Sequence, residues 1–210
     1  WEFGSSGMKK VVLAGAVLAL AAAVWADYPE DPGSRGVDWG AVRRRVQEET
    51  WAGDYVAGVE RQTRAVIGRY ETPPLGETGW YHDYFCPADA HKLEFNPDKP
   101  HEHVCPSCKK VYSGRPYDQC WNSNVHREII KAMQDAGMLY RITGKRDYFE
   151  YVRRMLLWYA EHYNDFQIHG RHAGKGRIRS QSLDEATHLV AVATAYWDIC
   201  ADLTPEERTT

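Results

Sequence analysis

Residues 139–163, LYRITGKRDYFEYVRRMLLWYAEHY, decide the fold class that the sequence predicts. Apolar residues recur at helical spacing from near Trp121 up to Thr143-Gly144, and glycine is a typical helix C-terminus. After the glycine, with Asp147 as the expected N-cap, the segment is apolar nearly all round, which indicates a helix packed on two sides. Because the connection is short, the two helices are expected to form an antiparallel pair.

Helical spacing continues on both sides of this pair. Upstream, apolar residues recur at this spacing over 37–72, with Asp38 as N-cap and Gly53 or Gly58 as points where the stretch could divide into two helices. Downstream, a helix is expected over 181–203, followed by the start of another. The sequence therefore predicts an all-α chain of antiparallel helix pairs.

Residues 85–114, FCPADAHKLEFNPDKPHEHVCPSCKKVYSG, interrupt the helices and concentrate possible metal ligands. The spacing of Cys105 and Cys108 lets both sulfurs reach one ion from a tight turn, and Cys86 and Asp89 repeat that spacing earlier. Three thiolates with one oxygen or nitrogen suit structural, tetrahedral zinc. The predicted ligands are Cys86, Asp89, Cys105 and Cys108, with His91 or His103 as alternatives to Asp89.

This segment is expected to form a small zinc-ribbon-like insertion at residues 80–117, with short strands at 92–95 and 110–112. A disulfide among its cysteines is the main alternative, since the chain has an export signal, and free thiols are a second one. Of the five cysteines in the chain, Cys120 and Cys200 lie outside the predicted site and are expected to be buried and inert.

The N-terminal residues have the sequence of a targeting signal rather than that of a folded segment. Residues 1–7, WEFGSSG, have the character of a cloning remnant, and residues 8–26 have the basic start and apolar run of a secretory signal, with cleavage expected after Ala26. An uncleaved anchor is the alternative. We therefore expect residues 27–210 to work in the periplasm or outside the cell. A net charge of −3 and a pI near 6.3 give no case for nucleic acid or an anionic membrane as partner.

A cationic loop at residues 164–180 and the helix that follows it hold the candidate substrate-binding residues. The loop cations could hold carboxylate or sulfate groups, although a solvated surface loop is the plainer interpretation. Hydrogen-bonding side chains at the start of the helix share one face, as would a simple capping cluster. The candidates are Arg177, Arg179, Gln181, Glu185 and His188, with His188 also a weak candidate for a catalytic base and with Trp121, Asn122 and His126 as further groove residues.

Thirteen tyrosines and eight tryptophans are many for one domain, and they fit either stacking on sugar rings or packing between helices. Three motifs follow in order: FCPADAHKLEFNPDKPHEHVCPSCKKVYSGRPYD at 85–118, an aromatic-rich helix pair that ends in residues 139–163, and GRIRSQSLDEA at 176–186. In this order they resemble the heparinase II/III-like and alginate-lyase-like group of polysaccharide lyases, over about residues 80–203. The resemblance implies the N-terminal part of an α/α toroid that binds an acidic polysaccharide.

The reaction that the resemblance implies is β-elimination at a uronic acid, which requires a neutralised carboxylate, a base and a proton donor. In such enzymes the catalytic tyrosine and histidine lie further along the chain, so the 210-residue chain is expected to be inactive by itself. A glycoside hydrolase on a similar toroid is one rival, although Asp184 and Glu185 are the only carboxylates at the expected groove. A secreted helical module that binds carbohydrate or protein is another.

Overall fold

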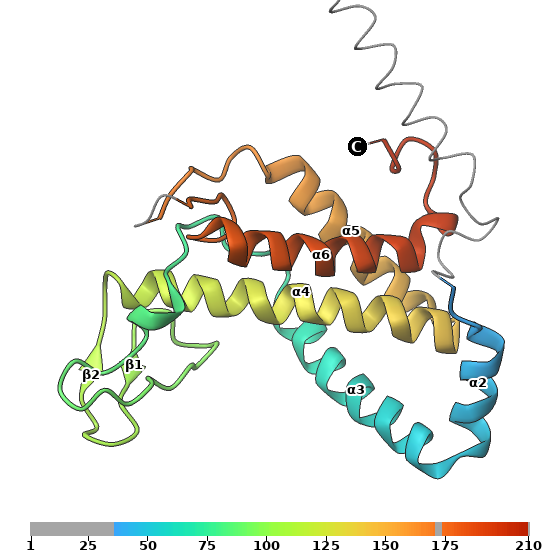
Figure 1. Cartoon of the computed structure of the whole chain (residues 1–210), viewed down its shortest axis with the longest axis horizontal. Coiled ribbons are helices and arrows are strands. Elements are labelled where there is room, and N and C mark those ends of the chain that lie inside the picture. Colours follow the sequence, from blue (N-terminus) through green and yellow to red (C-terminus); the bar gives the residue numbers. More distant parts are fainter. Residues whose placement is uncertain (1–35, 171–173, 210) are drawn as a thin grey trace, which may run out of the picture.

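The computed structural model describes residues 36–170 and 174–209, and these form an all-α fold, as the sequence predicts (Figure 1). The predicted signal peptide and cloning remnant lie outside the described residues. The α-helices are α2 (Trp39–Glu48), α3 (Thr50–Arg69), α4 (Tyr117–Thr143), α5 (Arg146–His162) and α6 (Ser182–Ile199). The short elements are the 3-10 helices η2 (Tyr81–Asp83) and η3 (Cys200–Asp202) and the antiparallel strands β1 (His103–Val104) and β2 (Val111–Tyr112).

Helix α4 is the centre of the fold, with α3, α5 and α6 packed on it (Figure 1). Its Ile129, Met133 and Leu139 are fully buried, because apolar residues at helical spacing place one continuous stripe against the neighbouring helices. Helix α6 approaches α4 closely at Gly137, where a Cβ atom would lie 3.0 Å from the Cβ of Asp198. A larger side chain at Gly137 would therefore separate the two helices.

The predicted helix pair is present. Helix α4 ends at Gly144, which has a left-handed conformation with φ of 68° and donates its N–H to Tyr140 O. Helix α5 then runs back along α4 (Figure 1). Two boundaries differ from the prediction: α4 already begins at Tyr117, and the N-cap of α5 is Lys145, so Asp147 lies in the first turn, where the helix dipole favours a carboxylate.

The N-terminal helical stretch divides at a position that the sequence did not indicate. Asp38 is the N-cap of α2, as predicted, and accepts the N–H of Ala41 at 2.9 Å. The break between α2 and α3 falls at Glu49, which has an extended backbone. Helix α3 continues through Gly53 and Gly58, so the prediction of a break there is wrong, because glycine weakens a helix that packing nevertheless maintains.

The insertion between α3 and α4 contains less strand than predicted. Strand β2 falls within the predicted 110–112, but it pairs with β1, which was not predicted. The predicted strand at 92–95 makes only one bridge, between Lys92 and Phe85. The next two backbone N–H groups bond to two different segments: Leu93 donates to Tyr84 O and Glu94 donates to Val104 O. No regular ladder of strand hydrogen bonds forms there.

The chain after η3 forms turns. Thr204 and Glu207 each accept the backbone N–H of the other, which is the hydrogen-bond pattern of a helix N-terminus. The predicted start of a further helix is thus present as one such turn. None of the described helices is long and apolar enough to cross a membrane.

Candidate functional site

Four side chains of the insertion converge on one point. The ligand atoms of Cys86, Asp89, Cys105 and Cys108 all lie within 4.8 Å of one another. The Sγ atoms of Cys86 and Cys108 are 3.6 Å apart, and both carboxylate oxygens of Asp89 lie 3.4 Å from Cys105 Sγ. A tetrahedral ion with Zn–S bonds of about 2.3 Å requires sulfurs about 3.8 Å apart, so these residues fit one such ion. All five cysteines are within the described residues and none forms a disulfide.

The two halves of this cluster have the same backbone conformation. Ala90 donates its N–H to Cys86 O at 2.8 Å, and Lys109 donates to Cys105 O at 3.1 Å. Ala90 and Lys109 both have positive φ, of 57° and 61°. Non-glycine residues rarely adopt this conformation, and they keep it where the surrounding structure requires it. The paired turns that the sequence predicted are therefore built alike and aim their side chains at one point.

Neither predicted alternative to Asp89 belongs to this group. His103 is fully buried, and its ring nitrogens lie 2.9 Å from the hydroxyl of Tyr84 and 2.9 Å from Asp118 Oδ1. Both nitrogens are thus occupied within the protein. His91 donates its backbone N–H to Asp89 Oδ1 at 3.1 Å while its ring is largely exposed, so it orients Asp89.

Asp118, in the first turn of α4, connects the insertion to the helical core. Its carboxylate bonds to His103 and to His101 Nδ1, which lies 2.6 Å away, and accepts the N–H of Gly114 at 2.9 Å. Cys120, two residues further on, is buried, as predicted, and it packs with two of the cluster cysteines. The insertion is therefore fixed to the start of α4 by polar and apolar contacts together.

Arg179, a predicted substrate-binding residue, is buried. Its guanidinium donates to Asp184 Oδ2 at 2.8 Å through Nε and to the carbonyl of Ser123 at 2.6 Å through Nη1. Burial lowers the pKa of this guanidinium, and the neighbouring Asp184 acts in the opposite direction. Arg179 joins the loop, α4 and α6, so most of its hydrogen-bonding capacity is used inside the protein.

Glu185, a second predicted substrate-binding residue, is also buried and accepts hydrogen bonds from three groups. These are the backbone N–H groups of Arg177, at 2.5 Å, and Arg179, at 3.2 Å, and the hydroxyl of Tyr163, at 2.8 Å. The guanidinium of Arg177 donates in turn to Phe166 O at 2.8 Å. Glu185 and Arg177 therefore shape the loop rather than present free groups to a ligand.

The predicted base, His188, is mostly buried. Its Nδ1 lies 2.8 Å from the carbonyl of Asp184 and donates to it, which leaves Nε2 as the basic nitrogen. Burial, followed by the positive charge of Arg179, lowers the pKa of His188, so the ring is neutral near pH 7. His188 does not line either of the two cavities described below.

The other predicted groove residues hold the chain before α4 in place. Trp121 donates to Asn96 O at 2.8 Å and Asn122 to Glu77 O at 3.0 Å. His126 is completely buried, so its prediction as a groove residue is wrong. Its ring nitrogens lie 2.8 Å from Tyr159 OH and 3.0 Å from Pro74 O, and burial lowers its pKa from 6.5 to about 3.

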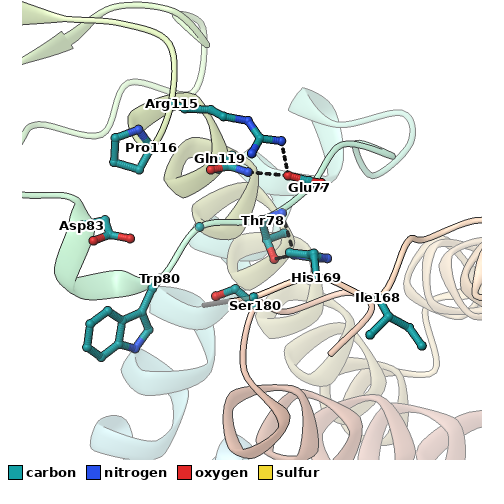
Figure 2. A pocket seen from close by; sticks show the side chains of 12 residues that line it. Glu77, Thr78, Trp80, Asp83, Arg115, Pro116, Gln119, Ile168, His169 and Ser180 are labelled. Atoms are coloured by element: carbon teal, nitrogen blue, oxygen red, sulfur yellow. Dashed lines mark hydrogen bonds and ion pairs between the residues drawn. The ribbon is translucent and has the colours of Figure 1, made fainter. Parts of the chain in front are cut away.

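A cavity of about 510 Å³ lies beside the start of α4, and we call it the Ser180 cavity. Figure 2 shows the side chains that line it. Its wall includes a pair in which Gln119 donates to the carboxylate of Glu77 at 2.6 Å. Across from them, His169 Nε2 accepts the N–H of Thr78 at 3.0 Å, and Nδ1 lies 2.8 Å from Gln167 O. Both nitrogens of His169 are thus engaged. The residues that line this cavity include Glu77, Thr78, Trp80, Asp83, Arg115, Gln119, His169 and Ser180.

A second cavity, of about 390 Å³, also has Trp80 in its lining, and we call it the Arg127 cavity. Trp80 lines both cavities, and the consecutive residues 179–181 contribute Ser180 to one and Arg179 and Gln181 to the other. Of the predicted substrate-binding residues, Gln181 and Arg179 line this second cavity. The residues that line this cavity include Trp80, His82, Arg127, Arg179, Gln181 and Asp184.

Trp80 and Arg127 did not emerge from the sequence as candidates. Trp80 begins an aromatic run, Trp80-Tyr81-His82, in a segment without helical spacing, and such a run outside a helix is a usable signal for a binding surface. Arg127 lies within a long helix next to the buried His126, and only the packing of that helix shows that it faces a cavity.

Comparison with known proteins gives two curated relatives, whereas no protein-family model matches the chain. An alginate lyase of Stenotrophomonas maltophilia is 37% identical over 99 residues, which is 46% of this chain and 12% of that protein. An exo-oligoalginate lyase of Saccharophagus degradans is 33% identical over 107 residues, which is 50% of this chain and 14% of that protein. The predicted resemblance to alginate-lyase-like polysaccharide lyases is confirmed, and the matched part of the chain spans about one eighth of the length of these relatives.

Proposed function

We propose that this chain is part of a polysaccharide lyase that cleaves an acidic, uronate-containing polysaccharide by β-elimination. The observation that carries the proposal is the identity of 37% and 33% with two alginate lyases over about half of the chain. The antiparallel packing of α5 against α4, with α6 beside both, supports the further proposal that residues 27–210 form a portion of an α/α toroid.

The described residues fit binding better than proton transfer. β-Elimination requires a base with a free nitrogen or oxygen near the substrate and a nearby acid. In the described part of the chain, His126 and His169 have both ring nitrogens engaged, and His188 lies away from the two cavities. His82 does line the Arg127 cavity, where its ring packs 4.5 Å from the ring of Trp80. We therefore assign substrate binding, rather than the chemical step, to the groove formed by these cavities.

Zinc is the metal that we propose for the cluster of Cys86, Asp89, Cys105 and Cys108. Three sulfurs and one carboxylate oxygen, at the spacing of a tetrahedron, are donors that zinc accepts in closed, structural sites. When bound, the ion would stabilise two turns that each contain a residue with positive φ. Its role is structural, since the cluster supplies four protein ligands and lines neither cavity.

Export is proposed from the sequence of residues 8–26. A basic start followed by an apolar run and Val24-Trp25-Ala26 supports cleavage after Ala26 and a periplasmic or secreted protein. The mass of the protein recovered from the periplasm or culture medium tests this. A mature chain that begins at Asp27 is expected, and a chain that retains the apolar run would instead support an uncleaved anchor.

The lyase proposal is tested with the full-length gene product that contains this sequence. Polymannuronate, polyguluronate and a neutral glucan are incubated with it, and ultraviolet absorbance of the unsaturated uronate is followed. Absorbance is expected to rise with the two uronate polymers and not with the neutral glucan. New reducing ends without this absorbance would support a glycoside hydrolase, and binding without cleavage a carbohydrate-binding module. The 210-residue chain by itself is expected to bind without cleaving.

A further inference from the structure

The two cavities share Trp80 as a lining residue, and we treat them as one groove. Trp80 lines both, and the backbone of residues 179–181 runs between them. Their volumes, about 510 and 390 Å³, fall in the range of about 300–1,000 Å³ that is typical of small-molecule sites. A ligand made of consecutive units could therefore occupy both sides of Trp80 at once.

The charge in this groove is uneven. In the Arg127 cavity, Arg179 is paired with Asp184 at 2.6 Å, so these two charges offset each other. Arg127 is exposed and forms no salt bridge or hydrogen bond with another described residue. It therefore leaves this cavity with a surplus positive charge, which favours a carboxylate.

The Ser180 cavity differs in charge. Its arginine, Arg115, is paired with the carboxylate of Glu77, and Asp83 also lines the cavity. The hydroxyl oxygen of Ser180 is buried and has no hydrogen-bond partner among the described residues. The carboxylate of Glu77 and the amide of Gln119 are polar groups that this cavity offers to a ligand hydroxyl. This side of the groove suits the hydroxyl edge of a sugar.

Trp80 itself is held firmly between the two cavities. Its carbonyl accepts a hydrogen bond from Cys120 Sγ at 3.2 Å, and its ring lies 4.5 Å from the ring of His82. The side chain is half-buried, and Figure 2 shows it at the edge of the Ser180 cavity, across from Ile168. A fixed indole with polar groups around it is suited to the C–H face of a sugar ring.

We propose that one uronate unit stacks on Trp80 with its carboxylate at Arg127, and that the adjoining unit enters the Ser180 cavity by its hydroxyl edge, with its own carboxylate directed away from Glu77 and Asp83. Gln181 lies beside Arg127 and can bind the carboxylate or a hydroxyl of the first unit. Glu77 and Gln119 face the hydroxyls of the second unit. The inference rests on the proposed function, which makes the ligand an acidic polysaccharide, and it names the residues that select the acid.

The test is a calorimetric titration of the 210-residue chain with a mannuronate trisaccharide and, for comparison, with cellotriose. Arg127→Ala and Trp80→Ala are each expected to weaken binding of the mannuronate trisaccharide about tenfold, since each removes an ionic or stacking contact. Arg127→Ala is also expected to remove most of the preference for the mannuronate trisaccharide over cellotriose. Trp80→Ala is expected to weaken the binding of both trisaccharides. The binding of Trp80→Phe, which keeps a ring, should be intermediate and excludes loss of the fold as the cause.

Matched controls lie on the exposed face of α3, far along the chain from the groove. Trp51 is 64% exposed and Arg61 is also exposed, so Trp51→Ala and Arg61→Ala are expected to bind as the unaltered chain does. Unchanged affinity in Arg127→Ala and Trp80→Ala would overturn this subsite and leave the proposed function standing. Absence of any uronate binding by the unaltered chain would also overturn it, and cleavage by the full-length product would then decide the proposed function separately.

Discussion

Gly79 packs directly against Cys120, so closely that a Cβ atom on Gly79 would lie 2.5 Å from the Cys120 sulfur. Gly79 also donates its N–H to Gln119 O at 2.7 Å, and the sulfur donates to the carbonyl of Trp80 at 3.2 Å. The segment that carries Trp80 is thus held against the first turns of α4. The same cysteine packs in the apolar cluster behind the metal ligands, so the groove and the insertion share a wall.

Gly79→Ala is expected to lower the free energy of unfolding by about 1–3 kcal/mol, because the added methyl group has no space beside Cys120. It should also weaken oligouronate binding, since Trp80 must move with its neighbour. Urea denaturation measures the first effect and calorimetric titration the second. Gly68→Ala is the matched control: its Cβ would meet nothing within 4 Å, so stability should be unchanged or slightly higher. Equal stability of the two variants would contradict the packing argument.

The metal proposal predicts about one zinc ion per purified chain, with the cluster thiols protected until a chelator is added. Cys108→Ser should lose most of the metal and lower the melting temperature, because one of four ligands is removed. Cys200→Ser changes a buried cysteine outside the cluster and should retain the metal. Elemental analysis with a free-thiol count checks both variants. A disulfide that involves Cys105 or Cys108, with no metal, would refute the zinc site.

Glu185→Gln is expected to destabilise the fold by about 2 kcal/mol. The carboxylate accepts from two backbone N–H groups through one oxygen and from a tyrosine hydroxyl through the other, and a neutral amide loses the charge that strengthens these hydrogen bonds. Glu161→Gln, at an exposed position on α5, is the control and should change little. Thermal unfolding followed by circular dichroism gives the difference. If Glu185 instead acted only in substrate binding, the two variants would have the same melting temperature.

Stability is expected to depend on pH through His126. Its pKa is lowered from 6.5 to about 3 by burial, so the unfolded chain binds a proton below pH 6.5 that the folded chain does not. This contribution is fully present above pH 6.5 and is lost as the pH falls, by up to about 1.4 kcal/mol per pH unit.

His126→Gln, which keeps one donor and one acceptor, should remove this part of the slope while lowering stability at neutral pH. Urea denaturation of the unaltered chain and of His126→Gln, from about pH 7.5 to about pH 5, gives the free energy of unfolding as a function of pH for each. Parallel slopes in the two chains would show that His126 titrates normally.

Local features were predictable from the sequence. The stop at Gly144 depends on one residue that tolerates positive φ, and the grouping of Cys86, Asp89, Cys105 and Cys108 depends on two turns of equal spacing. Each of these follows from a few neighbouring residues. The all-α class followed from apolar residues at helical spacing in the same way.

The groove was harder to predict because it depends on contacts between distant segments. Glu185 and Arg179 have the residue types of a substrate site, yet both are buried. Tyr163, just after α5, bonds to Glu185, and the carbonyl of Ser123, on α4, bonds to Arg179. Arg127 has no local signal and becomes a candidate only when α4 and α6 are side by side. Residue type and spacing alone do not determine which polar groups are already satisfied within the protein.

The contacts of Asp118 have a consequence for how this part of the protein opens. One carboxylate, at the start of α4, bonds to two histidines and one backbone amide of the insertion. The first turn of α4 and the insertion therefore form one cooperative unit, and their amide hydrogens should exchange with solvent together. The insertion cannot be excised as a loop, since its removal would leave the first turn of the central helix without the contacts that order it.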